Sequence, residues 1–147
     1  MPKPVLSDSL FNADDVATAV LAEANLQITN SQLGITNLTS VLQYQNNFEM
    51  AWSNIGDPVC YAFNGFIFLN GYVKSSNYGA SPTNILYINN SSFHPSEKIV
   101  SSTISRGGDH AFMIFLDTDG YLKGNNLTDE DSDNTIFLAF NLVGRYT

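Results

Sequence analysis

The chain has 147 residues and a formal net charge of −8, from 14 acidic and 6 basic residues. This acidity argues against nucleic acid and anionic membranes as partners, because both are bound through clustered lysine and arginine. A single cysteine excludes an intrachain disulfide and a cysteine-based zinc site. Cys60 lies within an apolar run, so we expect a buried and unreactive thiol.

Residues 1–12 are predicted to form an extended arm. Pro2 and Pro4 fix the backbone φ angle and disfavour a helix before them. The arm carries more large apolar side chains than a free tail usually does, which favours docking into another protein. These side chains are Val5, Leu6, Leu10 and Phe11. The arm lacks the apolar core of a signal peptide, so we expect a chain that is used without classical secretion.

Residues 13–47 are predicted to form a helical stem. Asn12 can cap the helix, and good helix formers follow it as far as about Asn25. Apolar residues then recur at every seventh position, the period of helices that wind around copies of themselves. With one further apolar position in the same register, the predicted stem contacts are Leu21, Ile28, Ile35, Leu38 and Leu42.

The second half of this stem has alternatives. Two Ile-Thr-Asn repeats and Gly34 have poor helix propensity, so residues 26–47 form either a coiled coil or a β-structured neck between chains. A third interpretation is a single helix that packs against its own head domain. An isolated segment of this composition would not hold a helix by itself.

Residues 50–147 are predicted to form a mainly β head, either a β-sandwich or a small barrel. Asn64-Gly65 stands between two apolar runs, and this dipeptide is a strong hairpin signal because both turn positions need positive φ. Asp119-Gly120 predicts a second hairpin turn, and Asn70-Gly71 is expected to end a strand. The predicted strands cover residues 59–63, 66–70, 72–74, 84–88, 98–104, 111–116, 121–123 and 135–143.

No catalytic, metal or cofactor site is predicted. The segment 117–120 resembles part of a calcium loop, but Phe115 and Asn126 stand where that loop needs a carboxylate and a glutamate. The acidic segment 129–133 is either a solvated loop or a weak calcium site. The serines form no Gly-x-Ser-x-Gly elbow, and the histidines are too isolated to make a zinc pair.

Loop aromatic residues are the best candidates for ligand contact. Tyr78 and Phe93 lie among serine, asparagine and proline, where flat rings beside amides suit a saccharide surface. The alternative is that these rings only pin loops onto the head. The complete set of candidate ligand contacts is Tyr78, Phe93, His94, Arg106 and His110. Trp52, at the start of the head, is expected to plug the junction with the stem.

The order of these elements resembles short bacteriophage fibres and receptor-binding proteins, including the heads of lactococcal siphophages. The resemblance covers roughly residues 50–147 and consists of a tryptophan after the neck followed by strands and turns in a shared order. Here these elements are Trp52-Ser53-Asn54, Val59 to Phe63, Asn64-Gly65, Phe66 to Gly71, Ile85 to Ile88, His94-Pro95-Ser96, Phe112 to Gly120, and Ile136 to Val143.

The resemblance implies a homotrimeric virion protein, made in the host cytoplasm. A stem that carries a β head also suggests a protein that binds a surface and has no enzymatic activity. Its N-terminus would anchor to a capsid, tail or baseplate protein, and its head would bind a saccharide or protein on the host surface. The apolar residues of the arm would then be the anchoring contacts. The chain lacks the large shoulder domain of some family members, which also fits a fibre mounted on a capsid. The alternatives are a structural decoration protein, a carbohydrate-binding module or a glycan hydrolase.

Overall fold

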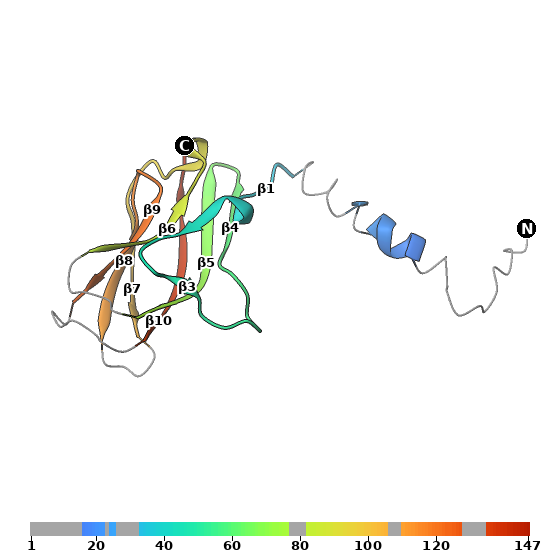
Figure 1. The fold of residues 1–147 in the computed structure, drawn as a ribbon. Coiled ribbons are helices and arrows are strands. Elements are labelled where there is room, and N and C mark those ends of the chain that lie inside the picture. Colours follow the sequence, from blue (N-terminus) through green and yellow to red (C-terminus); the bar gives the residue numbers. More distant parts are fainter. Residues whose placement is uncertain (1–15, 23, 26–32, 77–81, 106–109, 128–134) are drawn as a thin grey trace, which may run out of the picture. The chain divides into compact units, whose positions relative to one another are not determined.

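The computed structural model describes residues 16–22, 24–25, 33–76, 82–105, 110–127 and 135–147, and the chain divides into two units, residues 1–35 and 36–147 (Figure 1). In the first unit, residues 16–22 and 24–25 are helical, as predicted after Asn12. The arm and Ile28 lie outside the described residues. Within the described ranges, no helix has both the length and the apolar character that crossing a membrane requires.

The second unit contains two antiparallel sheets that form two layers (Figure 1). Sheet A has the order β1-β4-β5-β10, and β3 pairs with β5 beside β4. Sheet B has the order β2-β6-β9-β8-β7. This arrangement confirms the prediction of a mainly β domain. The elements are β1 (Thr36–Asn37), η1 (Thr39–Val41), β2 (Leu42–Tyr44), β3 (Glu49–Met50), β4 (Val59–Phe63), β5 (Phe66–Ser75), β6 (Thr83–Ile88), η2 (Ser91–Phe93), β7 (Ile99–Ile104), β8 (Ala111–Leu116), β9 (Tyr121–Asn126) and β10 (Ile136–Arg145).

Both hairpins predicted from turn residues are present. Asn64 and Gly65 have φ angles of 50° and 82°, and the flanking residues Phe63 and Phe66 are register partners of β4 and β5. A primed turn of this type matches the twist of the strands that it joins. Between β8 and β9, Gly120 has a φ angle of 83° and its amide donates to the carbonyl of Asp117 over 3.0 Å.

The core lies between the two sheets and follows the alternation of each strand. In β10, for example, every second side chain from Ile136 to Leu142 is buried, while the residues between them are half-buried or exposed. Sheet B contributes fully buried side chains such as Ile88 and Phe112 to the same core. Burying one such side chain stabilises the fold by roughly 1.5–3 kcal/mol.

Cys60 is fully buried in β4, as predicted. Burial raises the pKa of its thiol to about 12, because the thiolate would lose its hydration. The thiolate is the reactive form of cysteine, so this thiol is inert in the folded protein.

Of the alternatives for residues 26–47, the coiled coil is wrong for residues 36–47, which belong to the β unit. Their strands β1 and β2 pair with β4 and β6 of the same chain. Leu38 is only 2% exposed and its amide donates to the carbonyl of Cys60 over 2.8 Å. Leu42 lies in β2 opposite Ile88 and packs against the core. The poor helix formers around Gly34 allow the chain to leave the helix, and a buried site in the sandwich then stabilises Leu38 more than a marginal coil could. Among the other predicted stem residues, Leu21 is exposed on the helix and Ile35 is half-buried at the junction.

The expected strand end at Asn70-Gly71 is also absent. β5 runs without interruption through Gly71, because β10 pairs with it along its whole length. Gly71 is buried, and a Cβ atom at this position would lie 2.6 Å from the Cα atom of Pro58. The glycine therefore permits a close approach between two backbone segments instead of forming a turn.

The outer face of sheet A carries an exposed apolar band. Its members are 37–49% exposed and lie on three neighbouring strands: Val59, Tyr61, Phe63, Phe68 and Val143. Tyr61, Phe68 and Val143 are register partners, so their side chains form one continuous row across the sheet. Contiguous exposed apolar surface of this kind marks interaction sites in soluble proteins.

Candidate functional site

A groove of about 370 Å³ opens along the seam between β7 and β10. These are edge strands, since among the described strands β7 pairs with β8 alone and β10 with β5 alone. One end of the seam is closed where the amide and hydroxyl of Ser96 donate to the carbonyl of Arg145, over 2.9 and 3.2 Å. Gly144 lets the two strands approach there, because a Cβ atom would overlap the side chain of Ile99. Further along, the groove lies between residues 101–103 of β7 and residues 139–141 of β10.

Polar side chains line both sides of this seam groove. Sheet A contributes the exposed amides of Asn70 and Asn141, which are register partners, and β7 contributes three hydroxyl residues from Ser101 to Thr103. Within the described part of the chain, none of these five side chains forms a hydrogen bond to another protein group. Amides and hydroxyls both donate and accept hydrogen bonds. The groove therefore offers a cluster of unused donors and acceptors.

An aromatic shelf, formed by Trp52, Tyr72 and Phe137, adjoins the groove. Trp52 stacks on Phe137 with ring centroids 4.9 Å apart. The rings of Trp52 and Tyr72 form an edge-to-face pair with centroids 5.7 Å apart. These three residues and Ile104 line a hollow of about 150 Å³, and Tyr72 borders both this hollow and the groove. Trp52 thus belongs to the β unit, where it supports a surface beside the groove.

A second hollow of about 290 Å³ lies on the other side of the sandwich, between β2 and the residues before β4. Two of its polar groups bind each other: the hydroxyl of Tyr44 donates to Oδ1 of Asp57 over 2.6 Å. Partial burial and this bond raise the pKa of Tyr44 well above its ordinary value. Because this bond occupies two of its polar side chains, the hollow offers fewer unused groups than the seam groove and is a weaker ligand candidate.

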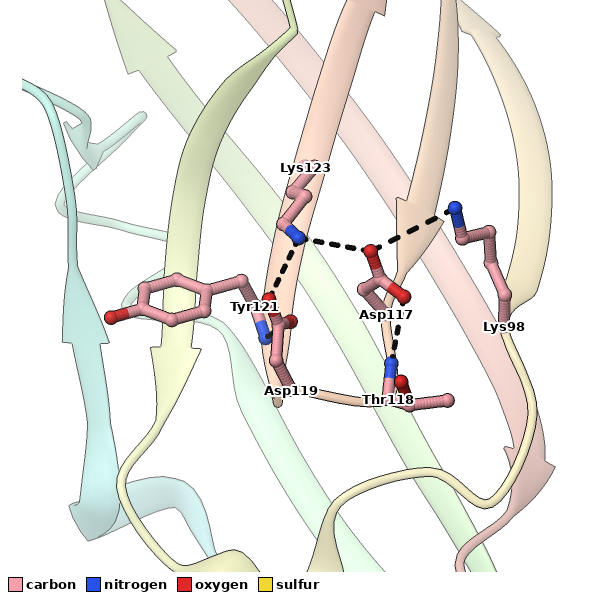
Figure 2. A network of polar contacts seen from close by, with 6 residues as sticks. All are labelled: Lys98, Asp117, Thr118, Asp119, Tyr121 and Lys123. Carbon is pink, nitrogen blue, oxygen red and sulfur yellow. Dashed lines mark hydrogen bonds and ion pairs between the residues drawn. The ribbon is translucent and has the colours of Figure 1, made fainter.

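The charged residues of sheet B form a compact network at the β8–β9 turn (Figure 2). Nζ of Lys123 lies 2.9 Å from Asp117 and 2.8 Å from Asp119, and Lys98 approaches Asp117 to 3.7 Å. The hydrogen bond from Lys123 lowers the pKa of Asp117. The two carboxylates that resembled part of a calcium loop are therefore held by lysine. The segment 129–133, the other calcium candidate, lies outside the described residues.

Replacing Asp117 by asparagine should make the free energy of unfolding depend less steeply on pH in the acid range. A carboxyl group with a lowered folded-state pKa stabilises the fold above its unfolded pKa of about 3.9, and this contribution is lost as the pH falls through the folded-state value. Because the network lies at the surface, with Asp117 and Lys123 partly exposed, we expect Asp117→Asn to cost about 0.5–1 kcal/mol at pH 7. Urea unfolding between pH 2 and 7 measures both effects.

The matched control is Glu97→Gln, which neutralises an exposed carboxylate that forms no ion pair among the described residues. This control should leave the pH dependence of the free energy of unfolding in the acid range unchanged. An equal response of Asp117→Asn and Glu97→Gln would show that net charge, and not the lysine network, determines the acid sensitivity.

The three predicted ligand contacts that the structure describes, Phe93, His94 and His110, do not line the seam groove. Phe93 packs against Tyr146 with centroids 5.0 Å apart, and Nε2 of His94 lies 2.9 Å from the carbonyl oxygen of Ile88. His110 lies at the opposite end of β7, where its backbone pairs with Ser105. Tyr78 and Arg106 lie outside the described residues. Ligand contact by these five residues remains a prediction.

The groove residues were not singled out by sequence patterns. Their one signal is polarity where a strand is otherwise apolar: Asn70 and Asn141 interrupt apolar runs, and residues 101–103 place three hydroxyls within a strand of isoleucine and valine. A polar residue on the exposed face of a strand is ordinary, so this signal alone does not predict a site.

Comparison with known proteins gives a structural match. No protein-family model matches the chain, and no curated protein matches it by sequence. The fold is similar to that of the receptor-binding protein gp15 of Listeria phage PSA, with a TM-score of 0.52 and 12% sequence identity. The match covers 95% of this chain and 82% of the phage protein. The chain thus has a fold similar to that of a phage receptor-binding protein.

Proposed function

We propose that the chain is a bacteriophage receptor-binding protein whose β unit binds a ligand on the host-cell surface. The observation that carries the proposal is the seam groove, where three strands expose polar side chains that have no hydrogen-bond partner among the described residues. The similarity to the Listeria phage protein adds support at the level of the fold. In this proposal the arm of residues 1–12 anchors the protein to another virion protein.

A homotrimer is the second part of the proposal. The row of Tyr61, Phe68 and Val143 on the outer face of sheet A supports self-association, since it leaves apolar side chains exposed in a single chain. The next row of the same face, with Val59, Asn70 and Asn141, then has to stay open for the ligand. Leu21, with Val16 and Val20 exposed beside it on the helical segment, supports a short interchain contact ahead of the β unit. Three weak sites on one particle would gain avidity without new contacts.

Binding without catalysis is the third part. Glycoside hydrolysis generally needs two carboxyl groups that flank the scissile bond. The described residues that line the seam groove include no aspartate or glutamate. A groove of amides and hydroxyls can hold a ligand by hydrogen bonds, and its described lining includes no group suited to protonate a leaving oxygen.

The test is retention of the fluorescently labelled full chain on a panel of Gram-positive and Gram-negative cells. We expect saturable retention on some strains and competition by unlabelled chain, with an unrelated acidic protein as control. Light scattering on the same sample should give the mass of three chains. Incorporation into particles without retention on any strain would favour a purely structural decoration role.

A further inference from the structure

We infer that the seam groove and the aromatic shelf together form a binding site for an uncharged saccharide. This inference rests on the proposed function and assigns a ligand class to its site. The groove volume of about 370 Å³ lies near the lower end of the range for small-molecule sites, roughly 300–1,000 Å³. A site of this size suits one or two sugar units more than an extended chain.

The first argument is the match of hydrogen-bonding groups. A sugar presents several hydroxyls that each donate and accept, and the groove presents amides on one side and hydroxyls on the other. Asn70 and Asn141 are register partners on the exposed face of sheet A and line the groove, and Ser102 lies on the exposed side of β7. Since these groups have no protein partner in the described structure, a ligand gains their bonds without breaking others.

The second argument is the position of the aromatic shelf. A sugar ring carries an apolar C–H face besides its hydroxyls, and aromatic rings offer the apolar surface that this face needs. Tyr72 is 40% exposed and borders both hollows, so one ligand can contact the ring and the polar groove together. Stacking between Trp52 and Phe137 holds the rest of the shelf in place.

The third argument is the absence of charge. Among the described residues, neither the lining of the groove nor that of the adjoining hollow includes a lysine, arginine, aspartate or glutamate. Sites for phosphate or carboxylate ligands use arginine or lysine. A chain with a net charge of −8 also repels polyanions at long range. These features favour a neutral sugar over a phosphorylated or acidic one.

The test uses the emission of Trp52, the single tryptophan of the chain, during titration of the full protein. The probes are glucose, galactose, N-acetylglucosamine and glucose 6-phosphate. We expect a saturable change with at least one neutral sugar and a weaker one with the phosphate ester. Asn141→Ala should weaken the affinity about tenfold, the upper end of what one neutral hydrogen bond contributes. Asn89→Ala, an exposed asparagine away from the groove, should leave it unchanged.

Three results would overturn the inference: no saturable change with any neutral sugar, tighter binding of the phosphate ester, or equal effects of Asn141→Ala and Asn89→Ala. Cell retention separates this failure from failure of the proposed function. If retention survives periodate, which destroys sugars, but not protease, the chain binds a surface protein, and only the saccharide assignment fails. If no strain retains the chain, the proposed function fails, and the titration still decides whether the groove binds sugars.

Discussion

Leu38→Ala should destabilise the β unit by about 2–5 kcal/mol, as truncation of a fully buried leucine does. Leu38 lies in the core at 2% exposure, beside the backbone of β4. The measurement is urea unfolding followed by Trp52 emission, which reports on the β unit because the only tryptophan is there. We expect a lower midpoint with an unchanged dependence on urea.

The control for this prediction is Leu21→Ala, the same substitution at a position that is 62% exposed on the helical segment. Alanine is a good helix former, so the midpoint of the β unit should remain within experimental error. The opposite result is a small effect of Leu38→Ala on unfolding together with a lower oligomeric mass. It would show that Leu38 contacts other chains in a stem and not the core of the β unit.

Gly120→Ala should destabilise the β unit by roughly 2–3 kcal/mol. This is the sum of about 1–2 kcal/mol for a side chain at positive φ and about 1 kcal/mol for the lost hydrogen bond between His94 and the carbonyl of Ile88. Gly120 has a φ angle of 83°, and a Cβ atom there would overlap the ring of His94. That ring also contacts Tyr87 and bonds to the carbonyl of Ile88, so moving it disrupts the end of β6. Thermal unfolding monitored by circular dichroism measures the loss.

Gly56→Ala is a matched control, because Gly56 has a φ angle of 90° but no neighbouring atom near the position of a Cβ atom. It should show the backbone cost alone, about 1–2 kcal/mol. In the double variant Gly120→Ala/His94→Ala, the overlap is absent. The stability losses of the single variants Gly120→Ala and His94→Ala should therefore add up to more than the loss of the double variant. Equal losses for Gly120→Ala and Gly56→Ala would mean that His94 moves aside at no cost.

The sequence predicts the fold best where local chemistry decides it. Asn64-Gly65 required a hairpin because few residues tolerate positive φ at two successive positions, and the structure has that hairpin. The apolar runs also located β10, although β5 was expected to end at Asn70-Gly71 and instead runs through it. The seven-residue spacing was misleading at Leu38 and Leu42, because both leucines pack in the β core. Spacing alone does not say which surface covers an apolar side chain.

The candidate site was beyond prediction for a different reason. Its polar residues come from β5, β7 and β10, and their proximity depends on how two sheets stack and where their edges separate. No local pattern records that arrangement. The predicted contacts Phe93 and His94 were chosen because they stand in loops, yet the fold gives both rings packing partners of their own.

The pairing of β5 with β10 has a consequence for how the chain folds. The hairpin of β4 and β5 can form early, but the second neighbour of β5 arrives only after every strand of sheet B, in pairs as distant as Phe66 and Arg145. Such non-local closure slows folding, so we expect the β unit to reach its native state late. Until then, the uncovered edge of β5 is open to strands of other chains, and nascent or truncated molecules without β10 would be prone to aggregate.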